Sequence, residues 1–391
     1  MKQTSPHQDF VHTGPGTLAG RFMRQFWQPI FRSDELRSGR AVPVRVMSED
    51  FTLYRGESGE AHLLGFRCAH RSVQLSSGWV EGDSIRCLYH GWKYDASGQC
   101  IEQPPEPKPF ADKIRIPSYP VREYIGLIFA FLGEGEPEPF PRLERFEDPK
   151  RTLWVTGYER NCNYFQNIEN TTDICHVPFT HRRSFGFKAI EMPRLSVAES
   201  SWGIEYWVTL ANGGKLVTQY GMPNRAYIAG KEGHGTAQID TEAIIFKVPI
   251  DDTRHYALQV RSALLSDEAQ TTFRQSLAAH DEAVKNTVPT GVLCDRILEG
   301  KLALDDVPVD QTGTGLSGEY AFLEDDVSQI GQGVIVDRSQ EHLGQSDVGV
   351  ALTRRLWERE LQALAEGRPL RKWTRAPGLV PGGSWVTKET V

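Results

Sequence analysis

Cysteine and histidine occur as mixed pairs in two short segments that sixteen residues separate. The first segment is Cys68-Ala69-His70, and the second is Cys87-Leu88-Tyr89-His90. A thiolate and an imidazole from each of two loops can close around a two-iron, two-sulfur cluster, in which cysteines bind one iron and histidines the other. Zinc sites of the Cys2His2 type usually keep both cysteines in one pair and both histidines in the other. The mixed pairs therefore predict a [2Fe-2S] cluster rather than a zinc finger.

This ligand set also indicates what the cluster does. Replacing two thiolates by neutral imidazoles removes negative charge and raises the reduction potential, to roughly −150 to +300 mV in the Rieske arrangement. High-potential respiratory Rieske proteins carry an extra cysteine in each segment, whereas Val73 and Tyr89 stand at those places here. The segments therefore predict an electron-carrying Rieske [2Fe-2S] cluster outside a respiratory complex.

A second group of ligand-type residues lies in the segment DICHVPFTH. Asp173 and His176 are three residues apart and would share one face of a helix. His176 and His181 are five apart, so on a continuous helix they would diverge by about 140°. Because Pro178 lacks an N–H and restricts Val177, we expect it to end or kink the helix and let His181 turn back towards His176.

Two histidines and one carboxylate on one face of an iron leave positions open for oxygen and substrate. Histidines at this spacing are more often ordinary core or surface residues, but the cluster motif in the same chain favours a metal site. The local sequence leaves the carboxylate open, since Asp173 can bind the iron or hydrogen-bond a cluster histidine and bridge the two metals. We therefore predict a mononuclear Fe(II) site at His176 and His181.

Composition excludes several other classes of protein. The chain has 391 residues, a net charge of −7 and 39% hydrophobic residues, so it can bury a core and does not indicate a nucleic-acid partner. No apolar run approaches the length of a membrane span, and the first ten residues lack a signal-peptide core. The six scattered cysteines do not suggest a disulfide framework. We expect a cytoplasmic protein without a membrane segment.

The order of elements predicts four segments. Residues 1–40 form an N-terminal helical segment that we expect to pack on the catalytic domain. Short alternating strands separated by turn residues predict an all-β domain over 41–135. A Pro- and Glu-rich stretch over 136–149 reads as a linker. The remaining residues, 150–391, form the domain of the mononuclear iron, with strands, a helix near 161–176 and a strong final helix from Asp347 to Glu366.

The motifs as a set resemble the Rieske non-haem iron oxygenases, the terminal components of aromatic ring-hydroxylating systems, and most of all the phthalate-dioxygenase-like branch. The resemblance covers nearly the whole chain and rests on GTLAGRFMRQFWQPI, CAHRSVQL, CLYHGWKYDASGQC, NIENTTDICHVPFTH and FLEDDVSQIGQGVIVDRSQEHLGQSDVGVALTRRL. It implies an α+β fold with a small all-β Rieske domain. The catalytic domain would be helix-grip-like, with an antiparallel sheet and a long C-terminal helix.

The resemblance also implies a third iron ligand, an acidic residue far downstream. Glu324, Asp325 and Asp326 are the candidates, and aligning on a glycine and an Asp-Arg pair (Gly333, Asp337-Arg338) selects Asp325. Asp326 remains a competitor. A more distant alternative, His280-Asp281-Glu282, is expected on a surface helix.

Two further roles follow from the same family pattern. Asp173 becomes the bridging aspartate and Asn170 a residue beside the iron. In relatives the bridge joins the cluster of one subunit to the iron of its neighbour, which implies a head-to-tail homotrimer or stacked trimers. No nucleotide-binding fingerprint is present, so a separate NAD(P)H-dependent reductase, with or without a ferredoxin, is expected to supply electrons.

The expected activity is hydroxylation of an aromatic or related small organic substrate with O2. O- or N-demethylation and ring monohydroxylation are alternatives that the motifs do not separate from dihydroxylation. An electron carrier of a different class would need only the cluster and no second iron.

Overall fold

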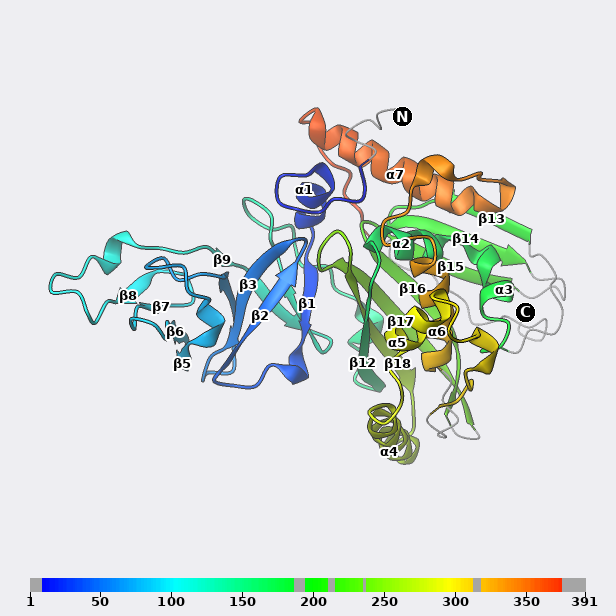
Figure 1. The fold of residues 1–391 in the computed structure, drawn as a ribbon, viewed down its shortest axis with the longest axis horizontal. Helices are drawn as coiled ribbons and strands as arrows, with labels where there is room; N and C mark the ends of the chain where they lie inside the picture. Colours follow the sequence, from blue (N-terminus) through cyan, green and yellow to red (C-terminus); the bar gives the residue numbers. More distant parts are fainter. Residues whose placement is uncertain (1–8, 186–193, 210–214, 235–236, 312–317, 375–391) are drawn as a thin grey trace. The chain divides into compact units, whose positions relative to one another are not determined.

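The structure is a computed structural model that describes residues 9–185, 194–209, 215–234, 237–311 and 318–374 (Figure 1). It divides into two compact units. The cluster unit comprises His12–Arg142 and Val248–Asp251, and the helix–sheet unit comprises Met1–Val11, Leu143–Lys247 and Asp252–Val391. Residues 12–40 fall within the cluster unit, and their packing on the catalytic domain stays a prediction.

The cluster unit is built almost entirely from short antiparallel strands. Its three sheets have the orders β2-β3-β4-β9, β5-β6-β7-β8 and β1-β11-β10. One short helix, α1, precedes them and is capped by Thr17, whose hydroxyl accepts the Gly20 N–H. The bounds are α1 (Leu18–Arg24), β1 (Gln28–Arg32), β2 (Arg40–Val46), β3 (Glu49–Arg55), β4 (Ala61–Gly65), β5 (Trp79–Glu81), β6 (Ser84–Arg86), β7 (Lys93–Tyr94), β8 (Cys100–Glu102), β9 (Ser118–Tyr119), β10 (Val121–Tyr124) and β11 (Leu127–Ala130).

The core of the cluster unit lies directly beneath the two cysteine–histidine segments. Cys68 and Cys87 are buried together with Leu75, Trp92 and Tyr94 in one hydrophobic cluster. Apolar burial is the main stabilising term in so small a unit, so the loops that carry the cysteines are anchored by the core itself.

The helix–sheet unit contains one large antiparallel sheet of seven strands. Its order is β12-β18-β17-β16-β15-β14-β13. Strands β13 to β18 are neighbours in the sheet in the order of the sequence. β12, which precedes them in the sequence, pairs antiparallel with β18, from Arg151↔Leu264 to Arg160↔His255. The bounds are β12 (Arg151–Arg160), β13 (Arg194–Glu199), β14 (Gly203–Thr209), β15 (Lys215–Gly221), β16 (Arg225–His234), β17 (Ala237–Pro249) and β18 (His255–Leu264).

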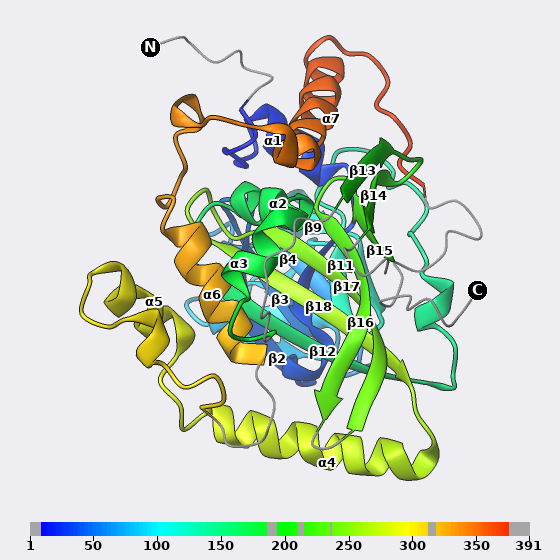
Figure 2. The same ribbon diagram turned by 90° about the vertical axis from the view of Figure 1, so that its right-hand side faces the viewer.

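Helices cover this sheet, as Figure 2 shows, with α2, α3 and α6 drawn in front of it. α2 contacts both α6 and α7, and α3 contacts α6. α4 packs on the sheet through Phe273, whose ring lies 4.7 Å from that of Trp154. The bounds are α2 (Tyr164–Thr172), α3 (Val177–Thr180), α4 (Asp267–Val284), α5 (Thr290–Leu298), α6 (Gly318–Ile330) and α7 (Val348–Ala365).

The expected C-terminal helix is confirmed as α7. It buries Leu356, Trp357 and Leu361 on one side, and it ends where Gly367 adopts a φ of +67°, a conformation that glycine takes without strain. Among the described helices, none is long and apolar enough to cross a membrane. The mixed architecture confirms the predicted α+β class, with one unit built mainly of short strands and a second unit in which helices cover a large sheet.

Candidate metal centres

The two cysteine–histidine segments form loops with matching backbone hydrogen bonds. The N–H of Cys68 donates to the carbonyl of Val73, and the N–H of Cys87 donates to that of Trp92, both at 2.9 Å. Gly91, with a φ of +72°, allows the second loop to turn tightly after His90. Both cysteines are 2% exposed. The loops thus present two buried thiols at equivalent positions.

The histidines of these loops lie side by side. The His70 and His90 ring centroids are 4.4 Å apart, and His70 stacks on Trp92 with an interplanar angle of 6°. The Nδ1 of His70 is buried and has no hydrogen-bond partner among the described residues. A buried polar atom normally has a partner, so this nitrogen is suited to bind a metal.

The thiols fit the same ligand set. Burial raises the pKa of the Cys87 thiol, and the adjacent Cys68 raises it further. Two thiolates so close together would repel each other without a cation, and a bound metal deprotonates its thiol ligands. The Tyr94 hydroxyl lies 3.3 Å from the Cys68 Sγ. Buried thiols and an unpartnered imidazole nitrogen therefore fit a [2Fe-2S] cluster at Cys68, His70, Cys87 and His90.

The second group of predicted ligands also converges. One ligand atom each from His176, His181 and Asp325 lies within 4.8 Å of the others. The Asp325 Oδ1 is 3.9 Å from the His176 Nε2 and 3.5 Å from the His181 Nε2. Within the described residues this is the single set of three or more His, Cys, Asp or Glu side chains found with such geometry. Two imidazoles and one carboxylate suit a non-haem Fe(II) with open positions.

Asn170 lies beside this set, at the C-terminal end of α2. Its Nδ2 donates to the Asp325 Oδ1 at 3.2 Å and is 3.3 Å from the His176 Nε2. The Gln166 side chain, one turn earlier, donates to the backbone carbonyls of Gln329 and Gly333. α2 and α6 are therefore tied together, which places Asn170 and Asp325 against each other.

The chain direction changes at Asp173, earlier than we expected. α2 ends at Thr172, and Asp173 has an extended backbone whose carboxylate accepts the Cys175 N–H. The expectation that Asp173 and His176 share a helical face is therefore wrong. Pro178 does not end this helix but stands in the first turn of α3, where its missing N–H costs nothing. His181 still returns to His176, since α3 ends directly before it.

Asp173 is half-buried, and burial raises the pKa of its carboxyl group. The His176 Nδ1 contacts the backbone carbonyl of Asp173 rather than its carboxylate. The Asp173 side chain thus remains available for another partner, and its role as a bridge between metals stays a prediction.

The three consecutive acids of α6 have three different partners. Glu324 accepts from the His181 Nδ1 at 3.1 Å, and Asp325 faces the two histidines. Asp326 accepts from the Nε of the buried Arg160 at 2.6 Å. The geometry therefore favours Asp325 over both neighbours as the third ligand.

Charge in this region explains the pKa of Asp325. Burial opposes its ionisation, but the hydrogen bond to His181 and the positive charge of Arg160 outweigh burial and lower its pKa to about 2. Burial likewise opposes the charged form of His181, yet hydrogen bonds to Asp325 and Glu324 raise its pKa to about 9. Asp325 is therefore ionised at neutral pH and can bind a cation.

Sequence reasoning missed two contributors to this site. Arg160 carried no motif signal, although it is buried and pairs with the acid next to Asp325. Glu324 entered only as a candidate ligand, not as the partner of His181. The alternative metal ligands around His280 lie apart from this set. His280 is buried on α4 and hydrogen-bonds Glu319 at 2.7 Å, and Asp281 and Glu282 are exposed.

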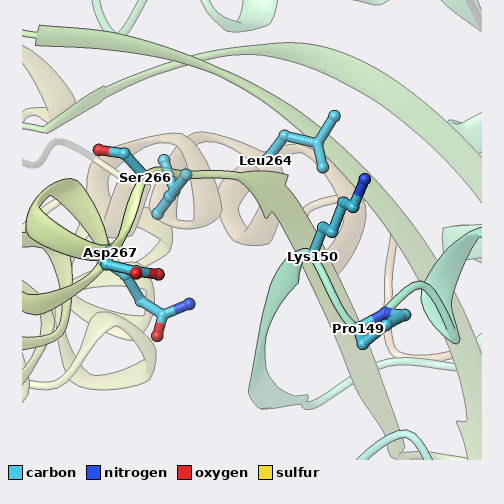
Figure 3. Close-up of a pocket in the computed structure, with 7 residues that line it drawn as sticks. Pro149, Lys150, Leu264, Ser266 and Asp267 are labelled. Atoms are coloured by element: carbon cyan, nitrogen blue, oxygen red, sulfur yellow. The ribbon is translucent and has the colours of Figure 1, made fainter.

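A hollow of about 440 Å³ lies elsewhere, where β18 leads into α4 (Figure 3). It is lined by Pro149, Lys150, Leu264, Leu265, Ser266, Asp267 and Gln270. None of these residues belongs to either metal site. The one lysine and the one aspartate among them do not form a recognisable group of catalytic residues.

Known proteins match this chain in sequence and in fold. Residues 26–120 match the Rieske [2Fe-2S] domain. The phenoxybenzoate dioxygenase subunit alpha of Ectopseudomonas oleovorans is 30% identical over 93% of this chain and 86% of its own length. The 5,5'-dehydrodivanillate O-demethylase oxygenase subunit of Sphingobium sp. (strain NBRC 103272 / SYK-6) is 28% identical over 97% of this chain and 85% of its own length.

The fold has matching solved structures. A chain in the reduced complex between oxygenase and ferredoxin in carbazole 1,9a-dioxygenase matches with a TM-score of 0.64 and 19% identity, over 93% of this chain and 95% of that chain. Sequence, fold and both ligand sets agree with one another. The chain therefore belongs to the Rieske non-haem iron oxygenases, as a terminal oxygenase subunit that carries a Rieske [2Fe-2S] cluster and a mononuclear iron.

Proposed function

We propose that this oxygenase hydroxylates an aromatic carboxylate at an iron held by His176, His181 and Asp325. The observation that carries the iron assignment is the convergence of these three side chains within 4.8 Å. Bound Fe(II) would supply the redox chemistry with O2. Asn170 holds the Asp325 carboxylate from one side, which fixes the direction of that ligand.

Electrons would enter through the cluster at Cys68, His70, Cys87 and His90. The chain shows no nucleotide-binding fingerprint, so we propose that a separate NAD(P)H-dependent reductase supplies them, with or without a ferredoxin. The carbazole dioxygenase relative, whose oxygenase was solved with a ferredoxin, supports a protein partner of this kind. We further propose a homotrimer in which Asp173 couples the cluster of one subunit to the iron of the next.

Buried positive charge in the helix–sheet unit supports an anionic substrate. Lys247 on β17 is 2% exposed. Burial, together with the charge of Arg160, lowers its pKa to about 7, although the charge of Asp325 acts in the opposite direction. Two guanidinium nitrogens of Arg160 also lack hydrogen-bond partners in the described part of the chain.

A buried cation is costly unless an anion accompanies it. Arg160 already lies 2.6 Å from the Asp326 carboxylate and 4.0 Å from that of Asp325, so Lys247 is the buried cation that a substrate carboxylate would balance. The names of the two relatives, a phenoxybenzoate dioxygenase and a dehydrodivanillate demethylase, point to the same class of substrate. Because the second relative is an O-demethylase, O-demethylation of a methoxylated aromatic carboxylate is an alternative reaction for this chain.

The experiment is a substrate-depletion screen with a surrogate reductase, NADH and O2. Benzoates with chloro, phenoxy or methoxy substituents would be compared with the matching benzamides. We expect turnover of carboxylates with at least tenfold preference over amides, and loss of that preference in Lys247→Met. Equal turnover of acid and amide would exclude the anionic substrate class.

The control for the iron assignment is His176→Ala in the same assay. This variant should keep the visible spectrum of the cluster, because the cluster ligands lie in the other unit, and should lose all turnover. Undiminished turnover would show that the iron lies elsewhere. Formaldehyde among the products would distinguish demethylation from ring hydroxylation.

A further inference from the structure

Glu324 is a buried residue of α6, and its carboxylate hydrogen-bonds two residues of the segment that follows α3. Its side chain is 1% exposed. Its Oε2 accepts from the His181 Nδ1 at 3.1 Å and from the Ser184 Oγ at 2.5 Å. A carboxylate in such a place needs hydrogen bonds to offset its desolvation, and both of these come from the segment that carries His181.

These contacts determine which nitrogen of His181 carries the proton. An ionised carboxylate can only accept hydrogen bonds, so the Nδ1 must donate. A metal bound at this site would take the lone pair of the Nε2, which faces the Asp325 Oδ1, 3.5 Å away. A metal ligand needs this neutral form with the free nitrogen directed at the metal.

The other histidine of the site has a different kind of support. The His176 Nδ1 contacts the backbone carbonyl of Asp173. A neutral carbonyl fixes the ring orientation but adds no charge, whereas a hydrogen bond to an ionised acceptor is roughly twice as strong as one between neutral groups. The two imidazoles are therefore supported unequally.

The position of Glu324 follows from the geometry of α6. Successive residues of an α-helix are rotated by about 100°, so neighbouring acids point to different sides of one helix. Asp325 meets the His181 Nε2 while Glu324 meets the His181 Nδ1. The dipeptide thus holds both edges of one imidazole ring.

We propose that Glu324 is a positioning residue that fixes the tautomer and the ring orientation of His181, so that its removal weakens iron binding. This inference rests on the proposed iron site and goes beyond it, since Glu324 itself does not touch the metal. Partners of this kind typically change metal affinity by about 10–100-fold when they are removed.

The test measures iron affinity by competition with a ferrous chelator in Glu324→Ala and Glu324→Gln. We expect a loss of about tenfold or more for Ala, and a smaller loss for Gln, whose amide oxygen still accepts from the Nδ1 but carries no charge. The EPR spectrum of the Fe(II)–nitric oxide adduct should change in both. Because Gln is isosteric, it also decides the matter if the Ala variant fails to fold.

A matched control lies on the same helix. Glu319 also hydrogen-bonds a buried histidine, His280, at 2.7 Å, but neither residue belongs to the iron site. Glu319→Gln should leave iron affinity and the EPR spectrum unchanged, and the cluster absorbance should be normal in every variant.

Two outcomes separate this inference from the iron assignment. If His181→Ala loses iron and both Glu324 variants keep wild-type affinity and spectrum, Glu324 has no positioning role and the site stands. If His181→Ala keeps its mononuclear iron, the site itself is wrong and the role of Glu324 falls with it.

Discussion

At the scale of single residues, His255 shows how burial fixes a protonation state. Its Nδ1 donates to the Cys162 carbonyl, and its Nε2 accepts from the Asn167 amide, both at 2.8 Å. Burial, together with the charge of Arg160, lowers its pKa to about 3. The imidazole is therefore neutral in the folded protein and ties β18 to α2.

This neutrality makes stability depend on pH. Below the usual pKa of 6.5 the unfolded chain binds a proton at His255 that the folded chain excludes down to about pH 3. The free energy of unfolding should therefore fall with decreasing pH through this window, by about 1.4 kcal/mol per unit well below pH 6.5.

Urea unfolding of the wild type and of His255→Asn at pH 7.5 and pH 5.0 measures this contribution. Asn keeps polar groups at the site but does not titrate, so we expect a less stable variant with a flatter pH dependence. An identical pH dependence in both proteins would contradict the assignment.

At the scale of elements, α7 supports the end of α2 that precedes the iron site. Gly349 in the first turn of α7 lies so close to the Thr172 carbonyl that an added Cβ would overlap it and the Tyr206 ring. Thr172 is the last residue of α2. The contact requires glycine because no side chain fits between the two helices.

We expect Gly349→Ala to destabilise the protein by about 1–3 kcal/mol through overpacking, and to reduce iron occupancy because the end of α2 must shift. Thermal unfolding and iron quantitation measure both effects. Gly291 in α5 is the control, since an added Cβ there would meet nothing within 4 Å, so Gly291→Ala should be neutral or slightly stabilising. Equal effects at both positions would refute the packing argument.

Local patterns predicted some of these elements better than others. The mixed cysteine–histidine pairs and the periodicity of residues 347–366 depend on nearby residues only, so their loops and helix were foreseen. The sequence predicts that the helix ends at Pro178, whereas it ends before Asp173. Proline is a strong local signal for a helix end, and an aspartate with an extended backbone is not. The partners of Glu324 and Asp326 are long-range: Arg160 lies 166 residues before Asp326, and no spacing rule reaches so far.

At the scale of the whole molecule, the proposed trimer makes a prediction about mixed assemblies. If the cluster of one chain serves the iron of its neighbour, a cluster-deficient chain and an iron-deficient chain can complement each other. We expect co-expressed His70→Ala and His176→Ala chains to regain part of the turnover that each lacks alone.

The mixture needs two controls. Each variant expressed alone should be inactive, and tagged chains should co-purify, which shows that mixed assemblies form. Co-purification without any turnover would mean that electrons pass within one chain.

The three consecutive acids Glu324, Asp325 and Asp326 determine which parts of the chain must be moved together if the iron site is transplanted into another scaffold. Their three side chains reach His181, the metal position and Arg160, and these partners belong to two other stretches of the chain. A graft of α6 alone would carry three acids without their counterparts, and a one-residue insertion upstream would rotate every acid onto its neighbour's partner. The three acids therefore have to be moved as a unit, together with β12 and the segment that follows α3.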